Sequence, residues 1–114
     1  MKMQVAVVIP CYRVKAHILS VISKIDSSVN LIYVVDDDCP EKTGEYVTQN
    51  CKDERVKVLT HRKNLGVGGA VKTGYQQALR DNVDIVIKVD GDGQMDPSQI
   101  HHLVLPIRQK KADY

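Results

Sequence analysis

The stretch Val83-Asp84-Ile85-Val86-Ile87-Lys88-Val89-Asp90-Gly91-Asp92-Gly93-Gln94 is an apolar run that ends in two aspartates and a glutamine. The run predicts a buried strand over Val83–Val89, because strands covered on both faces are rich in branched aliphatic residues. Oxygen atoms of Asp90, Asp92 and Gln94 are the hard ligands that Mg²⁺ or Mn²⁺ takes, with positions left for water and phosphate. The alternative is an acidic turn in which glycine supplies positive φ, and an isolated Asp-Gly-Asp favours that alternative.

The composition predicts one ordinary globular domain. The chain has 114 residues, 43% of them hydrophobic and 26% charged, with a net charge of +2, which carries no signal for nucleic-acid or membrane-surface binding. Without a signal peptide or a membrane-length apolar run, we expect the chain to be cytoplasmic. A longer parent protein would be the form that associates with the cytoplasmic face of a membrane. The cysteines are expected to be free thiols, and neither they nor the histidines have metal-ligand spacing: Cys11, Cys39, Cys51, His61, His101 and His102.

Strand and helix patterns alternate along the chain. Short apolar runs predict strands at Met3–Ile9, Leu31–Val35, Val56–Leu59 and Val83–Val89. Between them, amphipathic patterns predict helices at Ile18–Ile25, Thr43–Asn50 and Ala70–Arg80. The order βαβαβαβα predicts a three-layer α/β/α fold with a mostly parallel sheet and right-handed crossovers.

A fourth helix is expected to follow the 83–94 stretch. Asp96 suits its N-cap, Pro97 its first position and Gln99 the third position of a capping box. Pro106 is expected to shorten or kink this helix. Its buried stripe would comprise Ile100, Leu103, Val104 and Ile107.

Four polar loops follow the four predicted strands. In a parallel sheet all strands end at the same edge, and ligands of open α/β sheets bind along that edge. The convergence of four such loops predicts a binding site more strongly than any one of them does. The loops are Pro10-Cys11-Tyr12, Asp36-Asp37-Asp38, His61-Arg62-Lys63-Asn64 and Asp90-Gly91-Asp92.

Two of these loops carry groups suited to a nucleobase. Tyr12 is placed to stack on a base, although an ordinary half-buried aromatic is the alternative. A carboxylate such as Asp37 could accept hydrogen bonds from a base N–H or a ribose hydroxyl. For the triplet Asp36-Asp37-Asp38, a turn into the next helix, helped by Pro40, is an equally good interpretation.

The segment Gly66–Gly74 is rich in glycine but does not match a P-loop, because Val71 occupies the position of the second glycine. It also follows the third strand, whereas dinucleotide-binding fingerprints usually follow the first. We interpret it as a helix start whose backbone can approach a ribose or phosphate, with Lys72 and Arg62 as counter-charges.

Taken together, these segments resemble the inverting, family-2 glycosyltransferases of the GT-A (Rossmann-like) fold, and most closely the dolichyl-phosphate mannosyl/glucosyltransferase-like branch. The resemblance covers nearly the whole chain, and its motifs occur in the family's order and spacing. The segments that carry it are Val8–Tyr12, Val34–Asp38, Asn64–Ala70 with Thr73-Gly74, and Asp90–Gln94 with Asp96-Pro97.

The resemblance implies a site for a nucleotide-sugar donor, a UDP- or GDP-sugar. The nucleotide would contact residues at matching positions, with Pro10 and Tyr12 lining the base pocket and Asp37 at the base edge. It would also contact the loop at Gly66 and Gly69, with Lys72 and Asp90. The Asp-x-Asp motif implies that Asp90, Asp92 and Gln94 hold the Mg²⁺ or Mn²⁺ that bridges the diphosphate.

Departures from the family pattern alter the charge of the donor pocket. Arg13-Val14-Lys15 follows Tyr12 where asparagine and an acidic residue are usual, and Val67 stands where lysine is common. Asp38-Cys39-Pro40 replaces the more usual Gly/Asn-Ser-Thr turn.

The family's catalytic domain is longer than this chain, so residues 1–114 are expected to be its incomplete donor-binding part, cut after the fourth β-α unit. The catalytic residues are therefore unassigned, and the general base is expected beyond Tyr114. The chain alone is expected to be inactive. Exposed strand edges and apolar faces would favour homo-oligomers.

The leading hypothesis is a metal-dependent glycosyltransferase whose acceptor is a lipid phosphate, a polysaccharide of the cell envelope or a small molecule. A sugar-phosphate nucleotidyltransferase is the second, disfavoured because Pro10-Cys11-Tyr12-Arg13 lacks the glycines of a phosphate loop. The third is a non-catalytic fragment that binds nucleotide or serves assembly.

Overall fold

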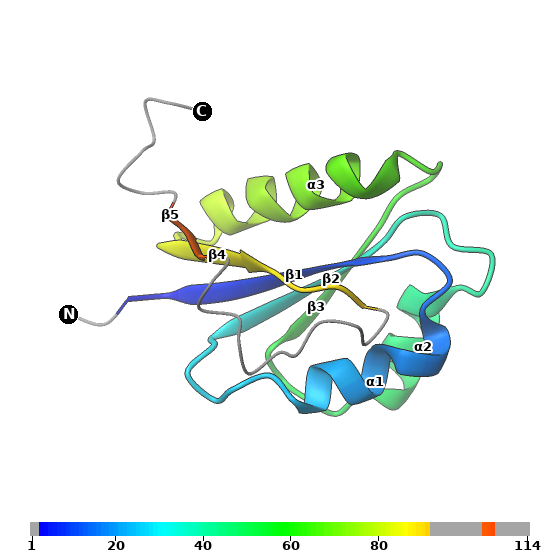
Figure 1. Cartoon of the computed structure of the whole chain (residues 1–114), viewed down its shortest axis with the longest axis horizontal. Helices are drawn as coiled ribbons and strands as arrows, with labels where there is room; N and C mark the ends of the chain where they lie inside the picture. The colour runs from blue at the N-terminus through cyan, green and yellow to red at the C-terminus, as the bar shows by residue number, and fades with distance from the viewer. Residues whose placement is uncertain (1–2, 92–103, 107–114) are drawn as a thin grey trace.

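Five strands form a single sheet in the computed structural model, which describes residues 3–91 and 104–106 (Figure 1). The strand order is β3-β2-β1-β4-β5. β1 to β4 run parallel, with β1 and β2 at the centre, so the predicted mostly parallel α/β fold is confirmed. The strands are β1 Val5–Cys11, β2 Leu31–Asp36, β3 Val56–Thr60, β4 Ile85–Lys88 and β5 Val104–Pro106, and the helices are α1 Lys15–Ser23, α2 Thr43–Asn50 and α3 Gly66–Arg80.

The helices cover both faces of the sheet, as the sequence predicts. Figure 1 shows α1 and α2 together on one face and α3 alone on the other. Alternate residues of β1 serve the two layers: Val7 and Ile9 pack in the core beneath α1 and α2, whereas Ala6 and Val8 pack beneath α3. This alternation follows from the two-residue period of a strand, and both sets are fully buried.

The last predicted helix is wrong where the structure can test it. Residues 104–106 form the strand β5, antiparallel to β4, with Ile87 beside Val104 and Ile85 beside Pro106. Proline disrupts a helix because it lacks an N–H, whereas the edge of a sheet tolerates it. The other residues of that predicted helix, including its cap and the remainder of its apolar stripe, lie outside the described ranges.

Most other boundaries agree with the sequence to within two residues, and α2 agrees at both ends. The exceptions are α1, which begins at Lys15, three residues before the predicted start, and α3, which begins at Gly66 rather than Ala70. No helix in the described part of the chain is long and apolar enough to cross a membrane.

Small residues let α3 approach β1 closely. Ala70, Gly74 and Ala78, spaced by four residues, are the buried positions of the helix. A Cβ atom added at Gly74 would lie 2.6 Å from both Cγ atoms of Val8, which is itself fully buried in the central strand. The distance between this helix and the sheet is therefore set by the missing side chain of Gly74.

We expect Gly74→Ala to lower the free energy of unfolding by about 1–3 kcal/mol, because the new methyl group must displace a packed strand residue. Gly68→Ala is the matched control. It lies on the same helix with nothing within 4 Å of its added Cβ, so we expect it to be neutral or to stabilise by up to about 1 kcal/mol. Urea denaturation followed by circular dichroism measures both. Equal effects of the two substitutions would contradict the close approach.

Candidate functional site

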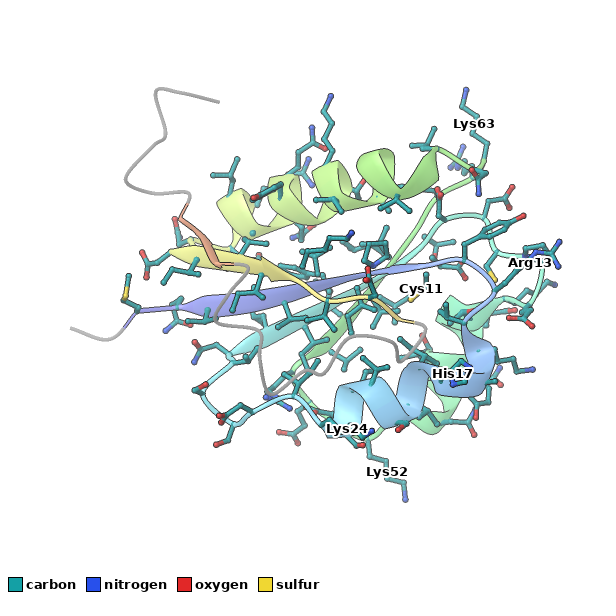
Figure 2. All side chains as sticks on the ribbon, viewed as in Figure 1. Cys11, Arg13, His17, Lys24, Lys52 and Lys63 are labelled. Carbon is teal, nitrogen blue, oxygen red and sulfur yellow. The ribbon has the colours of Figure 1, made fainter. Side chains whose placement is uncertain are left out.

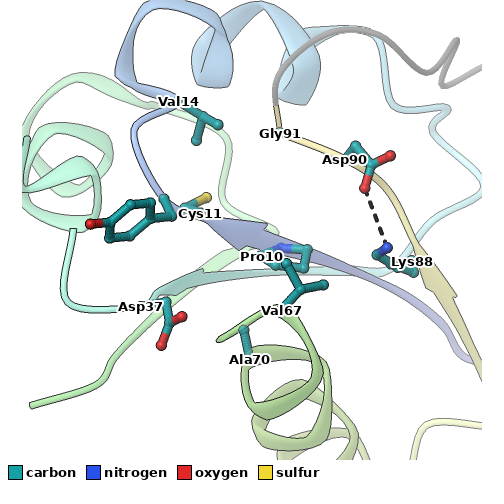
Figure 3. Close-up of a pocket in the computed structure, with 10 residues that line it drawn as sticks. Pro10, Cys11, Val14, Asp37, Val67, Ala70, Lys88, Asp90 and Gly91 are labelled. Atoms are coloured by element: carbon teal, nitrogen blue, oxygen red, sulfur yellow. Dashed lines mark ion pairs between the residues drawn. The ribbon is translucent and has the colours of Figure 1, made fainter. Parts of the chain in front are cut away.

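A cavity of about 190 Å³ opens at the carboxyl ends of the parallel strands (Figure 3). Three strand ends and the first turns of α3 contribute to its wall, so the predicted convergence is confirmed for three of the four loops. The loop His61-Arg62-Lys63-Asn64 does not contribute to the described part of the wall. The volume is below the range of roughly 300–1,000 Å³ for pockets that enclose a whole small ligand. The lining residues are Pro10, Cys11, Tyr12, Val14, Asp37, Val67, Ala70, Lys88, Asp90 and Gly91.

The structure brings together some of the predicted site residues and not others. Pro10, Tyr12, Asp37 and Asp90 line the cavity. In the described part of its wall, α3 contributes Val67 and Ala70 in place of the predicted glycines Gly66 and Gly69 and of Lys72, which is exposed. Asp92 and Gln94, the other predicted metal ligands, lie outside the described residues.

Two neighbouring aspartates at the end of β2 accept hydrogen bonds from helices on opposite faces of the sheet. Asp36 accepts hydrogen bonds from the backbone amides of Cys39 (2.8 Å) and Gly44 (2.7 Å), in the turn before α2 and the first turn of that helix. Asp37 accepts hydrogen bonds from the amides of Leu65 and Gly66, both 2.8 Å, where α3 begins. Both aspartates are buried. A carboxylate is favourable at a helix N-terminus, where backbone N–H groups lack partners.

Asp37 stays ionised because of these contacts. Burial by itself would raise the pKa of its carboxyl group, but the hydrogen bonds from Leu65, His61 and Gly66 outweigh it and hold the pKa below the ordinary value. The third residue of the triplet, Asp38, is exposed and adopts a left-handed backbone conformation with a φ of 55°. The interpretation of the triplet as a turn into the next helix is thus confirmed for Asp36 and Asp38, whereas Asp37 binds the start of α3 instead.

His61 connects the end of β3 to both Asp37 and α3. Its Nδ1 lies 2.8 Å from Asp37 Oδ1, and its Nε2 lies 2.7 Å from the hydroxyl of Thr73, which in turn donates to the carbonyl of Gly69. An ionised carboxylate can only accept, so Nδ1 must carry the hydrogen. The side chain of His61 is 10% exposed. The role of His61 beside Asp37 could not be read from the sequence, because the two residues are 24 positions apart and no local motif joins them.

The loop after β1 is bound by the sulfur atom of Cys39. The backbone N–H of Arg13 donates to Cys39 Sγ at 3.0 Å, and Thr43 Oγ1 lies 3.3 Å from the same atom. Burial raises the pKa of the Cys39 thiol, but the hydrogen bonds from Thr43 and the Arg13 amide outweigh it and bring the pKa below its usual value. Tyr12 extends from this loop with 44% of its surface exposed. The Arg13 guanidinium lies 5.5 Å from the centre of its ring.

Basic side chains gather at the same end of the molecule as the cavity. Figure 2 shows Arg13 and Lys63 reaching outward from the loops that follow β1 and β3. Within the cavity, Lys88 Nζ lies 3.4 Å from Asp90 Oδ1, and both side chains are roughly two-fifths exposed (Figure 3). Such an exposed pair is weak, contributing less than about 1 kcal/mol, so Asp90 remains available to another cation.

The described residues contain no group of three or more histidine, cysteine or acidic side chains arranged to hold a metal ion. Asp92 and Gln94 lie outside the described residues, so Asp90 is the one predicted metal ligand whose placement can be tested. Its carboxylate fits a divalent ion. It lies at a strand end, lines the cavity and has an exposed oxygen whose charged partner is a flexible lysine.

We expect Asp37→Asn to lower the free energy of unfolding at pH 7 by about 1–3 kcal/mol, because an amide nitrogen cannot accept the hydrogen bonds that the carboxylate receives. The folded pKa of Asp37 is depressed, so its contribution is complete above the unfolded pKa of about 3.9 and is lost as the pH falls through the folded pKa. The difference from wild type should therefore shrink in acid. Urea denaturation between pH 7 and pH 3 measures it, with the exposed neighbour Asp38→Asn as the control. A difference independent of pH would contradict this role.

The sequence matches the family model of Glycosyl transferase family 2 over residues 6–114. It is 32% identical to the dolichol-phosphate mannosyltransferase of Pyrococcus furiosus, over 93% of this chain and 30% of that protein. The chain therefore spans less than a third of the length of that relative.

Two solved structures share the fold. Residues 1–349 of S. aureus TarS in complex with UDP align with a TM-score of 0.65 and 26% identity, over 79% of this chain and 28% of that one. The mannosyltransferase PcManGT from Pyrobaculum calidifontis, in complex with GDP-Man and Mn²⁺, aligns with a TM-score of 0.61 and 22% identity, over 81% of this chain and 28% of that one.

The family match extends over nearly the whole sequence and agrees with the parallel sheet and the cavity at its carboxyl edge. This chain belongs to glycosyl transferase family 2.

Proposed function

We propose that this chain is the donor-binding part of a glycosyltransferase that transfers a sugar from a UDP- or GDP-sugar to an acceptor. The observation that carries the proposal is the cavity that joins Tyr12, Asp37 and Asp90. An aromatic face, a buried carboxylate and an exposed carboxylate come from three different strand ends. They suit a base, the edge of that base and a metal-bound diphosphate, respectively.

The base would bind at the side of the cavity formed by Pro10, Tyr12 and Asp37. Tyr12 presents an exposed ring for stacking, while the Cys39 contact with Arg13 fixes the backbone beside it. The volume that the described residues enclose suits a base better than a whole nucleotide sugar, so the sugar would extend toward Asp90 and beyond. The glycines Gly66 and Gly69 and the exposed Lys72 stay in the proposal as neighbours of the phosphates at the start of α3.

The metal site would consist of Asp90 together with Asp92 and Gln94, binding Mg²⁺ or Mn²⁺. In support, Asp90 offers an oxygen ligand at the cavity, and PcManGT was solved with Mn²⁺ and GDP-Man. A bound divalent ion would supply Lewis-acid stabilisation to the departing nucleoside diphosphate. Among this chain's own residues, Tyr12 and Asp37 would orient the donor, and Lys88 would neutralise Asp90 before the donor binds.

A lipid phosphate is the acceptor that the relatives favour, since the Pyrococcus furiosus protein is a dolichol-phosphate mannosyltransferase. Polysaccharide acceptors of the cell envelope remain the second class. The general base is unassigned. A nucleotidyltransferase stays disfavoured because the loop after β1 contains proline and tyrosine where a phosphate loop needs glycines.

We expect the chain to bind UDP or GDP only when Mn²⁺ or Mg²⁺ is present. Asp92→Asn should weaken this metal-dependent binding more than Asp37→Asn does, because it removes a ligand of the ion itself. Isothermal titration calorimetry with each nucleotide, with and without metal, measures both effects. If no nucleotide binds in a metal-dependent manner, the donor-site proposal is wrong. Equal losses in the two variants would count against the metal assignment alone.

We expect Tyr12→Ala to weaken nucleotide binding by about 1–3 kcal/mol, since the stacking surface for the base is lost. Tyr12→Phe keeps the ring and removes the hydroxyl, so its affinity should stay close to that of the wild type. The same calorimetric titration compares the two variants. Similar losses in both would indicate that the hydroxyl, and not the ring face, contacts the nucleotide.

A further inference from the structure

The carboxylate of Asp37 has room for one more hydrogen bond. An ionised carboxylate offers about four acceptor positions, two on each oxygen. Oδ1 accepts from the Leu65 amide and from His61 Nδ1, and Oδ2 accepts from the Gly66 amide, all at 2.8 Å. Within the described part of the chain, Oδ1 is therefore full and Oδ2 keeps one position.

A nucleobase that binds at this carboxylate must give up its hydrating water molecules. The Asp37 side chain is 5% exposed, and it lines the cavity. A donor or acceptor that is buried without a partner loses its hydration and gains nothing in return. The number of N–H groups on the base edge must therefore match the number of acceptor positions that Asp37 has left.

The bases differ in this number. Uracil presents a single ring N–H between two carbonyl groups, which needs one acceptor position. Guanine presents a ring N–H and an amino N–H side by side, a pair that needs both oxygens of a carboxylate. Cytosine and adenine present an amino group beside an unprotonated ring nitrogen, whose lone pair would face the negative charge of Asp37.

We infer that His61 makes this site selective for uracil over guanine, by occupying the acceptor position on Asp37 Oδ1 that the second guanine N–H would need. Thr73 holds the opposite nitrogen of the ring at 2.7 Å, so His61 cannot easily turn away. His61 is thus a specificity-determining residue that acts through Asp37. The inference rests on the proposed function, because it requires a nucleotide at this site, and it narrows the donor to a UDP-sugar.

The direct test compares UDP with GDP on the unmodified chain by calorimetry in the presence of Mn²⁺. We expect the dissociation constant of UDP to be lower than that of GDP by at least about tenfold, the usual consequence of one unpaired buried donor. CDP and ADP should bind more weakly than UDP. Equal affinities, or tighter binding of GDP, would overturn the inference and leave the donor site intact. Absence of binding by all four nucleotides would instead overturn the proposed function, and the inference with it.

Substitution of His61 tests the cause of the preference. His61→Ala frees Oδ1, so the ratio of GDP to UDP dissociation constants should fall to about threefold or less, chiefly because GDP binds more tightly. His61→Gln keeps an N–H donor and should retain most of the preference. His17→Ala, at an exposed histidine on α1, is the matched control and should leave the ratio unchanged (Figure 2). Circular dichroism verifies the fold of each variant.

The ratio of the GDP and UDP dissociation constants distinguishes a role of His61 in base specificity from a role in supporting the loop. If His61→Ala weakens both nucleotides by the same factor, His61 only supports the loop before α3 and the inference is wrong.

Discussion

The structure depends on two adjacent carboxylates at the end of β2. Because side chains alternate along a strand, Asp36 and Asp37 point to opposite faces of the sheet. Each carboxylate accepts hydrogen bonds from backbone N–H groups at or just before the start of a helix. Asp36 sets the start of α2 and Asp37 sets the start of α3. One pair of residues therefore joins one helix of each layer, α2 and α3, to the central strands, and it does so at the edge where the cavity lies.

The same carboxylates explain where sequence reasoning succeeded and where it did not. The four parallel strands and α2 follow from local apolar patterns, so their positions could be predicted closely. The start of α3 could not, since Gly66–Gly69 has poor intrinsic helix propensity and is stabilised by Asp37, nearly thirty residues away. Pairing of β5 with β4 is likewise a contact between distant segments, which the helical spacing of apolar residues concealed.

The candidate site shows a similar division. Parallel topology was enough to predict that Tyr12, Asp37 and Asp90 meet at one edge. The helix contribution was predicted less well. The early start of α3 determines which of its side chains turn toward the cavity, and these are Val67 and Ala70. His61 and Cys39 were not identified as site residues, because the contacts that join them to Asp37, Thr73 and Arg13 span 12 to 26 residues and no motif links them.

The contact between Lys88 and Asp90 gives the exposed carboxylate of the cavity a counter-charge from the same chain. Under the proposed function, a divalent ion that binds Asp90 would displace the Lys88 ammonium group from the carboxylate, and the lysine, being part of the chain, would stay nearby. An arriving diphosphate would then meet the displaced lysine as well as the metal ion. Lys88 thus neutralises Asp90 in the structure, and it would become an additional positive group for the donor once a metal ion holds that carboxylate.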